Sequence, residues 1–277
     1  MAITGGARGI GAATAAAFAR QGAQVAIGDL DAEVAAATAA EIGPNATAFV
    51  VDVTDRASVD AFVAGVQERL GGIDVYVNNA GIMPTGPFLE ESDELAAHQI
   101  AINISGVLFG MKAVLPSMVA RGGGHIVNVA SGAGKMGFPG GVTYCATKHA
   151  VVGMTEAARA EFRGSGIAFH IVMPAIVRTE LTSGMPDGRA VRSILPEQVA
   201  DAIVDAVASG RFDVYVPREM GVLARTSPLL PRVVRDGILK VTGADRSMLD
   251  MDQAARLAYQ QRIGQAQPAA ARPEIEA

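Results

Sequence analysis

The sequence predicts an α/β fold: a doubly wound parallel sheet of about seven strands with helices on both faces. Three observations lead to this prediction. Short runs rich in β-branched residues alternate with longer runs that suit helices, the order of a parallel sheet with helical crossovers. Several short runs are apolar at consecutive positions, as strands covered on both faces are. A glycine-rich stretch, "TGGARGIG", joins the first short run to the first long one, which is typical of Rossmann-type folds.

The expected elements follow the same order along the chain. Strands are expected at 1–4, 24–28, 47–52, 73–78, 125–130, 167–173 and 213–216. Helices are expected near 9–21, 31–42, 55–70, 93–120, 143–164 and 196–209. Thr54 or Asp55 should cap one helix, and Pro196 should lie in the first turn of another. The first strand is very short for a central strand, so we expect a misassigned start or a trimmed N-terminus.

Length and composition indicate one large domain. The chain has 277 residues, 50% of them hydrophobic, and a formal net charge of −5. This charge argues against a nucleic-acid partner. We expect a single domain over 1–264, including a helical extension from about 217, and a disordered tail at 265–277.

The sequence lacks the features that several other classes of protein require. The four histidines have no metal-ligand spacing, so no metal site is expected. The single cysteine, Cys145, excludes an internal disulfide and fits a reducing compartment. There is neither a basic-then-apolar leader nor an unbroken apolar run of about 18 residues. We therefore expect a cytoplasmic protein, and membrane contact is not expected.

The glycine loop and an acid after it predict a dinucleotide site. Backbone N–H groups in the loop and the positive end of the following helix can hold a pyrophosphate. Gly11 would let that helix lie close to the sheet. An acid about 20 residues further on binds ribose hydroxyls in such folds, and Asp29 occupies that place. Its carboxylate would repel a 2′-phosphate, which favours NAD over NADP, although Arg8 could bind such a phosphate.

Six motifs carry a family resemblance. In chain order they are "TGGARGIG", "NNAG" (78–81), "AINISG" (101–106), Ser131, "YCATK" (144–148) and "PAIVRT" (174–179). In combination they resemble the short-chain dehydrogenase/reductase family in its single-domain form, over about residues 1–216. The resemblance implies an oxidoreductase that transfers a hydride between a nicotinamide cofactor and an alcohol or ketone. It also implies a homodimer or homotetramer.

The resemblance assigns roles to individual residues. Asn103 would hold a water in a proton relay, and Ser131 would bind the substrate oxygen. The implied catalytic residues are Asn103, Ser131, Tyr144 and Lys148. The implied cofactor-binding residues are Gly5, Arg8, Gly9, Ile10, Gly11, Asp29, Asp52, Val53, Asn79, Ala80, Gly81, Tyr144, Lys148, Pro174, Val177 and Thr179.

Tyr144 and Lys148 are four residues apart, so they share one face of a helix. A free phenol has a pKa of about 10 and is a poor base at neutral pH. A nearby ammonium would lower that pKa by about 1–3 units. Tyr144 could then take the proton of an alcohol or return it to a ketone.

One position departs from the family pattern, and two alternative functions stay open. Ala175 stands where the family has glycine, so the loop after the sixth strand is expected to differ. The alternatives are a sugar-nucleotide epimerase or dehydratase, and a non-catalytic dinucleotide sensor. The glycine spacing and the short remainder after 216 argue against the first. The presence of Ser131, Tyr144 and Lys148 argues against the second.

The segment 217–243 carries an apolar stripe at helical spacing, with basic residues beside it. The stripe is Leu230, Val233, Val234, Ile238 and Val241. It packs on the domain or on another subunit, or else it walls the substrate cleft together with the loop 180–195. The second interpretation predicts a bulky apolar secondary alcohol or ketone rather than a sugar. A membrane surface is a weaker third interpretation.

Overall fold

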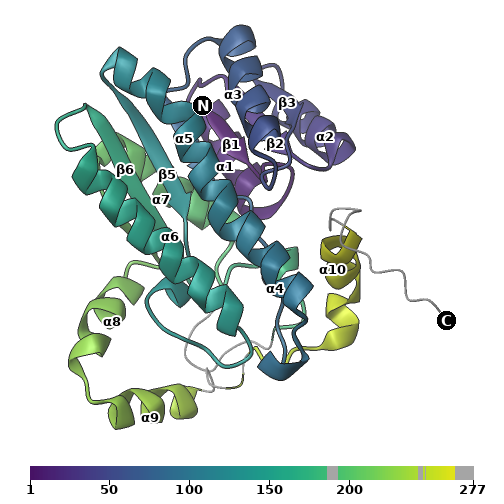
Figure 1. Cartoon of the computed structure of the whole chain (residues 1–277), viewed down its shortest axis with the longest axis vertical. Coiled ribbons are helices and arrows are strands. Elements are labelled where there is room, and N and C mark those ends of the chain that lie inside the picture. The colour runs from purple at the N-terminus through teal and green to yellow at the C-terminus, as the bar shows by residue number, and fades with distance from the viewer. Residues whose placement is uncertain (186–192, 243–245, 247, 266–277) are drawn as a thin grey trace.

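The computed structural model describes residues 1–185, 193–242, 246 and 248–265. Seven parallel strands form one sheet in the order β3-β2-β1-β4-β5-β6-β7, which confirms the predicted doubly wound topology (Figure 1). The predicted tail beyond residue 265 and part of the loop 180–195 lie outside the described residues. The strands are β1 (Ala2–Thr4), β2 (Val25–Asp29), β3 (Ala46–Val50), β4 (Val75–Asn78), β5 (Gly124–Val129), β6 (Ile167–Pro174) and β7 (Asp213–Val216).

Helices cover both faces of the sheet and bury a separate apolar core on each side. One core includes Ala15, Phe18, Ala35, Val199 and Ile203 from the helices of one face. The other includes Phe62, Val66, Val107, Met111 and Val151 from the helices of the other face. The first face carries α1 (Gly9–Arg20), α2 (Ala32–Ile42) and α7 (Pro196–Ser209), and the second carries α3 (Arg56–Leu70), α5 (Gly106–Arg121) and α6 (Val142–Glu161).

Local signals in the sequence set the helix starts. The Asp55 carboxylate accepts the Ala57 N–H at 2.9 Å and caps α3, so Asp55 rather than Thr54 is the cap. Pro196 is the first residue of α7, as predicted.

The short first strand is fully paired within the sheet. Residues 2–4 of β1 pair with β2, and Ala2 and Ile3 pair with β4 on the other side. The terminal amine of Met1 donates to Gln24 O at 2.7 Å, and Met1 O accepts the Ala26 N–H at 2.8 Å. Met1 therefore extends the ladder beyond the three strand residues.

The predicted helix 93–120 is interrupted. It consists of α4 (Asp93–Ile100), a π-helical turn at Ala101–Ser105, and α5. Such turns occur often at functional sites. By length and mean hydropathy, the run Asp93–Arg121 could cross a membrane. The sequence does not show this as an unbroken apolar run, because polar residues interrupt it. We interpret it as a core helix, because α5 buries Val107, Met111 and Met118 against the sheet.

Three helices follow β7. They are α8 (Met220–Thr226), α9 (Arg232–Thr242) and α10 (Gln253–Gln265). Figure 1 shows α8 and α9 projecting from the body as an arm at the lower left, whereas α10 lies at the right, beyond α4. In the described residues after 217, most of the chain lies in these helices.

Candidate active site

One cavity of about 1760 Å³ lies beyond the carboxyl ends of the strands, where ligands of such sheets bind. The turns after β1 to β6 bring to it segments that are distant in sequence. Two predicted site residues, Gly11 and Asn103, do not line it. Those that do are Gly5, Arg8, Gly9, Ile10, Asp29, Asp52, Val53, Asn79, Ala80, Gly81, Ser131, Tyr144, Lys148, Pro174, Val177 and Thr179.

The glycine loop has the shape of an anion cradle. Gly5 and Gly9 have φ of +62° and +53°, a conformation that favours glycine. A Cβ at Gly5 would lie 2.8 Å from Ala80 Cα, and one at Gly11 would lie 2.1 Å from Gly5 O. Gly11 therefore serves packing, as predicted, and not the cavity wall. Arg8 stands at the N-cap of α1 without a side-chain capping bond, so N–H groups of the first turn are available to a pyrophosphate.

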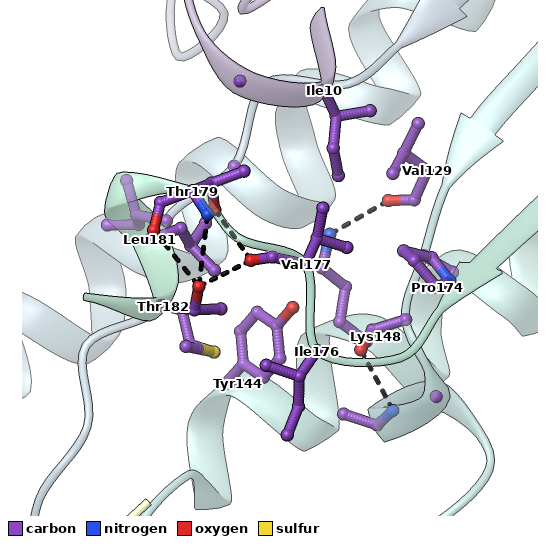
Figure 2. Close-up of a pocket in the computed structure, with 18 of the residues that line it drawn as sticks. Ile10, Val129, Tyr144, Lys148, Pro174, Ile176, Val177, Thr179, Leu181 and Thr182 are labelled. Atoms are coloured by element: carbon purple, nitrogen blue, oxygen red, sulfur yellow. Dashed lines mark hydrogen bonds between the residues drawn. The ribbon is translucent and has the colours of Figure 1, made fainter. Parts of the chain in front are cut away.

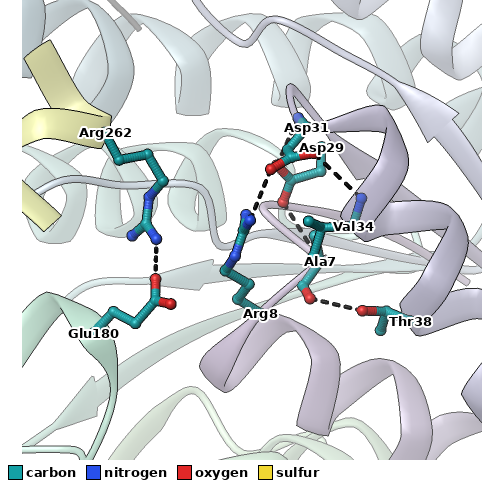
Figure 3. A network of polar contacts seen from close by, with 8 residues as sticks. All are labelled: Ala7, Arg8, Asp29, Asp31, Val34, Thr38, Glu180 and Arg262. Atoms are coloured by element: carbon teal, nitrogen blue, oxygen red, sulfur yellow. Dashed lines mark hydrogen bonds and ion pairs between the residues drawn. The ribbon is translucent and has the colours of Figure 1, made fainter. Parts of the chain in front are cut away.

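Two carboxylates, Asp29 and Asp31, lie beside the glycine loop at the carboxyl end of β2 (Figure 3). Asp29 Oδ2 accepts the Ala7 N–H at 3.0 Å, and its Oδ1 accepts the Asp31 N–H at 3.2 Å. Asp31, not Asp29, caps the next helix. The Arg8 guanidinium donates to Asp31 Oδ2 at 2.7 Å and holds the pKa of Asp31 below its ordinary value. In the sequence, Arg8 was the group that could bind a 2′-phosphate and so argued against Asp29. In the structure, Arg8 is already paired with Asp31.

The turn after β3 brings Asp52 and Val53, two of the predicted cofactor-binding residues, to the cavity. Asp52 Oδ1 accepts the Thr54 N–H at 2.8 Å and the Thr54 hydroxyl at 2.7 Å. Val53 is buried against Gly106, where a Cβ would lie 3.0 Å from Val53 Cβ. His98 of α4 also lines the cavity and was not predicted. Burial lowers the pKa of His98, and its Nε2 has no partner among the described residues.

The turn after β4 ties the glycine loop to the catalytic residues. The Asn79 side chain donates to Thr4 O at 3.0 Å and to Gly5 O at 2.8 Å. A Cβ at Gly81 would lie 3.2 Å from Asn103 Oδ1 and 3.6 Å from Lys148 Nζ. The predicted Asn79–Gly81 segment is therefore packed between both halves of the site.

Tyr144 and Lys148 lie on one face of α6 and point into the cavity (Figure 2). Both side chains are buried. Lys148 Nζ donates to Val129 O at 2.9 Å and lies 5.7 Å from the centroid of the Tyr144 ring. The Ser131 hydroxyl hydrogen-bonds Tyr144. A phenol, a hydroxyl and an ammonium thus meet in one buried corner, where they can hold an oxygen and move its proton.

Burial dominates the titration of this corner. It raises the pKa of Tyr144 above its ordinary value, and the Ser131 hydrogen bond opposes that rise. Burial also lowers the pKa of Lys148 to about 8. The sequence led us to expect a lowered phenol pKa, and the direction in the ligand-free protein is the opposite. The reason is that the phenol is desolvated while the ammonium bonds Val129 O beside the ring.

The loop after β6 closes over the glycine loop. Ala175 N donates to Val216 O at 2.8 Å and does not adopt a positive φ, so alanine here extends the sheet edge by one bond. A Cβ at Gly9 would lie 3.1 Å from Thr179 Cγ2. Val177 and Thr179 line the cavity on the side of Tyr144 (Figure 2).

The family model for short chain dehydrogenases matches residues 1–190. The chain belongs to the short chain dehydrogenase family. It is 47% identical over 184 residues to a sorbitol dehydrogenase of Cereibacter sphaeroides, which covers 66% of this chain and 72% of that protein. It is 40% identical to a galactitol 2-dehydrogenase of Agrobacterium fabrum over 76% of this chain and 83% of that protein.

One relative extends further. The probable oxidoreductase EphD of Mycobacterium tuberculosis is 37% identical over 258 residues, which cover 85% of this chain and 44% of that protein. The covered 85% of the chain is more than residues 1–216 alone could supply, so the similarity includes part of the extension after residue 216. Among solved structures, a short chain dehydrogenase from Burkholderia phymatum in complex with NAD superposes with a TM-score of 0.74 at 28% identity, over 81% of this chain and 91% of that one.

Membership decides the class of reaction. This short chain dehydrogenase is an oxidoreductase that transfers a hydride between a nicotinamide cofactor and the carbinol or carbonyl carbon of a secondary alcohol or ketone. The epimerase and sensor alternatives are correspondingly disfavoured.

In this short chain dehydrogenase, Asn103 lies behind the cavity and fixes a segment of its wall. Asn103 Oδ1 accepts the Ile82 N–H, and its Nδ2 donates to Ile82 O, both at 2.9 Å. From the other side, the Tyr259 hydroxyl accepts the Met83 N–H and Arg256 Nη2 donates to Met83 O, both at 2.8 Å. The Asn103 amide therefore fixes Ile82 in the cavity wall, and its role in a water-mediated proton relay stays a prediction.

Helix α10, which carries Arg256 and Tyr259, also holds the loop after Thr179. Arg256 Nη1 donates to Leu181 O at 3.0 Å and to Ser183 O at 3.1 Å. Arg262 forms an ion pair with Glu180 (Figure 3). Helix α10 therefore joins the turn after β4 to the loop after β6 across the cavity.

Sequence reasoning missed Asp31 and the contacts that α10 makes with the cavity wall. The available signal was the spacing of Arg256, Tyr259 and Ile263, three and four residues apart, which puts one arginine and two large side chains on one helix face. Arg256, Tyr259 and Ile263 are all buried.

The substrate side of the wall is largely apolar, but α9 contributes to it differently from the prediction. Arg232, Arg235 and Asp236 of α9 line the cavity, whereas Val233 and Val241 are exposed to solvent. The interpretation of the stripe as the cleft wall is therefore wrong for its described members. The apolar side chains on the wall are Met83, Phe138, Leu181, Met185, Met220, Leu223 and Met248.

Proposed function

We propose that Tyr144 is the general acid and base of this dehydrogenase. The observation that carries the proposal is the buried meeting of Tyr144, Ser131 and Lys148 on the wall of a cavity that also contains the glycine cradle. Ser131 would hold the carbinol oxygen against the phenol, and Tyr144 would take its proton in oxidation or return it in reduction. The bound nicotinamide would exchange the hydride with the same carbon.

Lys148 has two roles in this proposal. Its ammonium stabilises a phenolate at Tyr144 by charge, and it donates hydrogen bonds toward the ribose next to the nicotinamide. A cationic nicotinamide ring beside Val177 and Thr179 would add to the first effect. The raised pKa of the free Tyr144 is then offset only when the cofactor is present, which links proton removal to cofactor binding.

We further propose that NAD is preferred to NADP. Two carboxylates, Asp29 and Asp31, stand at the ribose edge, and both would repel a 2′-phosphate. Arg8, the group that could bind such a phosphate, is paired with Asp31 at 2.7 Å. The family leaves this choice open, since a gluconate 5-dehydrogenase from Burkholderia cenocepacia, with a TM-score of 0.72 at 30% identity over 77% of this chain and 91% of that one, was solved with NADP and tartrate.

For the substrate we propose a bulky apolar secondary alcohol or ketone. Support comes from the methionine, leucine and phenylalanine side chains on the wall, since methionine adapts to irregular apolar ligands. A polyol is the second candidate, because relatives are a sorbitol and a galactitol dehydrogenase and because the Tyr259 hydroxyl on the wall could bind a second oxygen.

The test is a panel of secondary alcohols and ketones with NAD and with NADP, followed by the absorbance of the reduced nicotinamide. The proposal expects a higher kcat/KM for an apolar ketone than for a polar one of similar size, and a loss of that preference in Leu223→Ser and Met185→Ser. A higher kcat/KM for sorbitol-like substrates would select the polyol instead.

Assembly and location complete the proposal. A homodimer or homotetramer through α5 and α6 is expected from the family resemblance, and light scattering at micromolar concentration tests it. A monomer at that concentration would contradict it. A cytoplasmic location is supported by Cys145, which is buried and free.

A further inference from the structure

The three valines of helix α9, whose side chains the structure describes, are exposed to solvent. Val233 and Val241 are 83% and 81% exposed, and Val234 is 45% exposed. The charged residues Arg232 and Arg235 lie on the side of the helix that lines the cavity. This is the reverse of an ordinary surface helix, which turns its apolar stripe toward the protein.

The segment before α9 adds to the exposed apolar surface. Val222 of α8 is 66% exposed and Leu229, in the turn that follows α8, is 82% exposed. Figure 1 shows α8 and α9 projecting together from the body of the molecule. We call residues 220–242 the arm. Exposed aliphatic groups gathered on one projecting segment are typical of a surface that binds another body.

The charge of the arm distinguishes between possible occupants. Helix α9 contains Arg232, Arg235 and Lys240 against a single acid, Asp236, whereas the whole chain has a net charge of −5. Pairing of two arms through their valines would place two net-positive helices side by side, with Lys240 next to Val241 on each, and this repulsion would oppose it. An anionic lipid surface would attract them while its interior received the valines.

We propose that the arm docks on an anionic bilayer, with Val233, Val234 and Val241 at the boundary between headgroups and acyl chains. This reverses the sequence-based expectation of no membrane contact. It goes beyond the oxidoreductase function and holds for any alcohol substrate. Because Met220 and Leu223 of α8 line the cavity, docking would place the substrate entrance close to the lipid.

The experiment is co-sedimentation of the full chain with vesicles. Vesicles of phosphatidylcholine alone are compared with an equal mixture of phosphatidylcholine and phosphatidylglycerol. The protein should sediment with the anionic vesicles, and the bound fraction should fall at about 1 M salt, where the Debye length is about 3 Å. The double variant Val233→Ser, Val241→Ser should bind at least roughly tenfold more weakly, because it removes two buried aliphatic side chains.

Two controls keep the test specific. Val50→Ser changes an exposed valine at the end of β3, away from the arm and from α5 and α6, and should bind vesicles like the unchanged protein. Circular dichroism and the melting temperature show whether the arm variant is folded. Lys240→Glu, which leaves the valines in place, should weaken binding to anionic vesicles and leave the melting temperature unchanged.

Either of two results overturns the proposal. One is no sedimentation with either vesicle composition. The other is a change in molar mass by light scattering when Val233 and Val241 are replaced, without any vesicle binding by the unchanged protein. The second result would assign the arm to contact with another copy of the chain.

Discussion

The cavity has two walls that are built by different means. The wall at the strand ends is made of tight turns, in which glycines and backbone groups fit against each other at distances that leave no room for a side chain. The wall from the extension is made of helices held by long side chains, chiefly Arg256 and Tyr259. Sheet topology therefore fixes the catalytic residues of the cavity. Access to the cavity and its shape depend on a segment outside residues 1–190, the range that the family model matches.

The strongest test of the strand-end wall is Tyr144→Phe. Losing the general acid and base should lower turnover by about 10²–10⁴-fold, while the cofactor still binds, because the glycine cradle is untouched. Turnover is followed by reduced-nicotinamide absorbance, and binding by quenching or calorimetry. Cys145→Ser is the matched control, because Cys145 is the next residue and does not line the cavity. Its turnover should stay within a few-fold, and unchanged turnover in Tyr144→Phe would refute the assignment.

The extension wall is tested by Arg256→Leu. This change leaves the carbonyl oxygens of Leu181, Ser183 and Met83 without their donor, which should cost about 3 kcal/mol or more, since an unsatisfied buried group costs about 1–3 kcal/mol. We expect α10 to detach, which urea unfolding and limited proteolysis would detect, and KM to rise.

A matched control for this wall is Arg262→Gln. Arg262 makes a partly exposed ion pair with Glu180, and such pairs contribute about 0–1 kcal/mol. Tyr259→Phe should fall between the two, because only the Met83 N–H loses its acceptor. Equal stability for all three variants would show that α10 is not held as described.

Asp29→Ala tests the cofactor preference on the strand-end wall. Removing one carboxylate from the ribose edge should narrow the ratio of kcat/KM for NAD over NADP by roughly tenfold, equivalent to about 1.4 kcal/mol. The gap should not close fully, because Asp31 and its pair with Arg8 remain. An unchanged protein that prefers NADP would show that Arg8 leaves Asp31 to bind the phosphate.

The smallest effect concerns pH and Lys148. Burial lowers the pKa of Lys148 to about 8 from its ordinary value of 10.5, so above pH 8 the unfolded chain binds more protons at this site than the folded one. Stability should therefore rise with pH, by about 1 kcal/mol between pH 8 and 9 from this group. Above pH 10 the raised pKa of Tyr144 acts in the opposite direction. Melting temperatures of the unchanged protein and of Lys148→Met over pH 7–9 test this, and only the unchanged protein should show the rise.

The sheet and its motifs were predictable because their signals are local. Strand and helix periods, the glycines at 5 and 9, and the Tyr144–Lys148 spacing each lie within a few residues of sequence, and the parallel topology then brings them to one edge. The contacts of Arg256 and Tyr259 with Met83 join residues more than 170 positions apart. They involve backbone atoms of Met83, so no pattern of side chains marks it as their partner.

The predicted orientation of α9 was wrong for a different reason. An apolar stripe at helical spacing identifies which residues share a face, but not whether that face meets the protein or the outside. The predicted direction of the Tyr144 pKa shift was wrong for a similar reason. The spacing to Lys148 is visible in the sequence, but the degree of burial is not.

The attachment of Met83 to α10 has a consequence for the order in which the enzyme is made. Translation delivers the glycine loop, Asp29, Ser131, Tyr144, Lys148 and Thr179 before it delivers Arg256 and Tyr259. A nascent chain can therefore complete the whole sheet, with β7 ending at Val216, while the N–H and carbonyl of Met83 still lack their partners. Synthesis of α10 would then be the step that completes this side of the cavity wall.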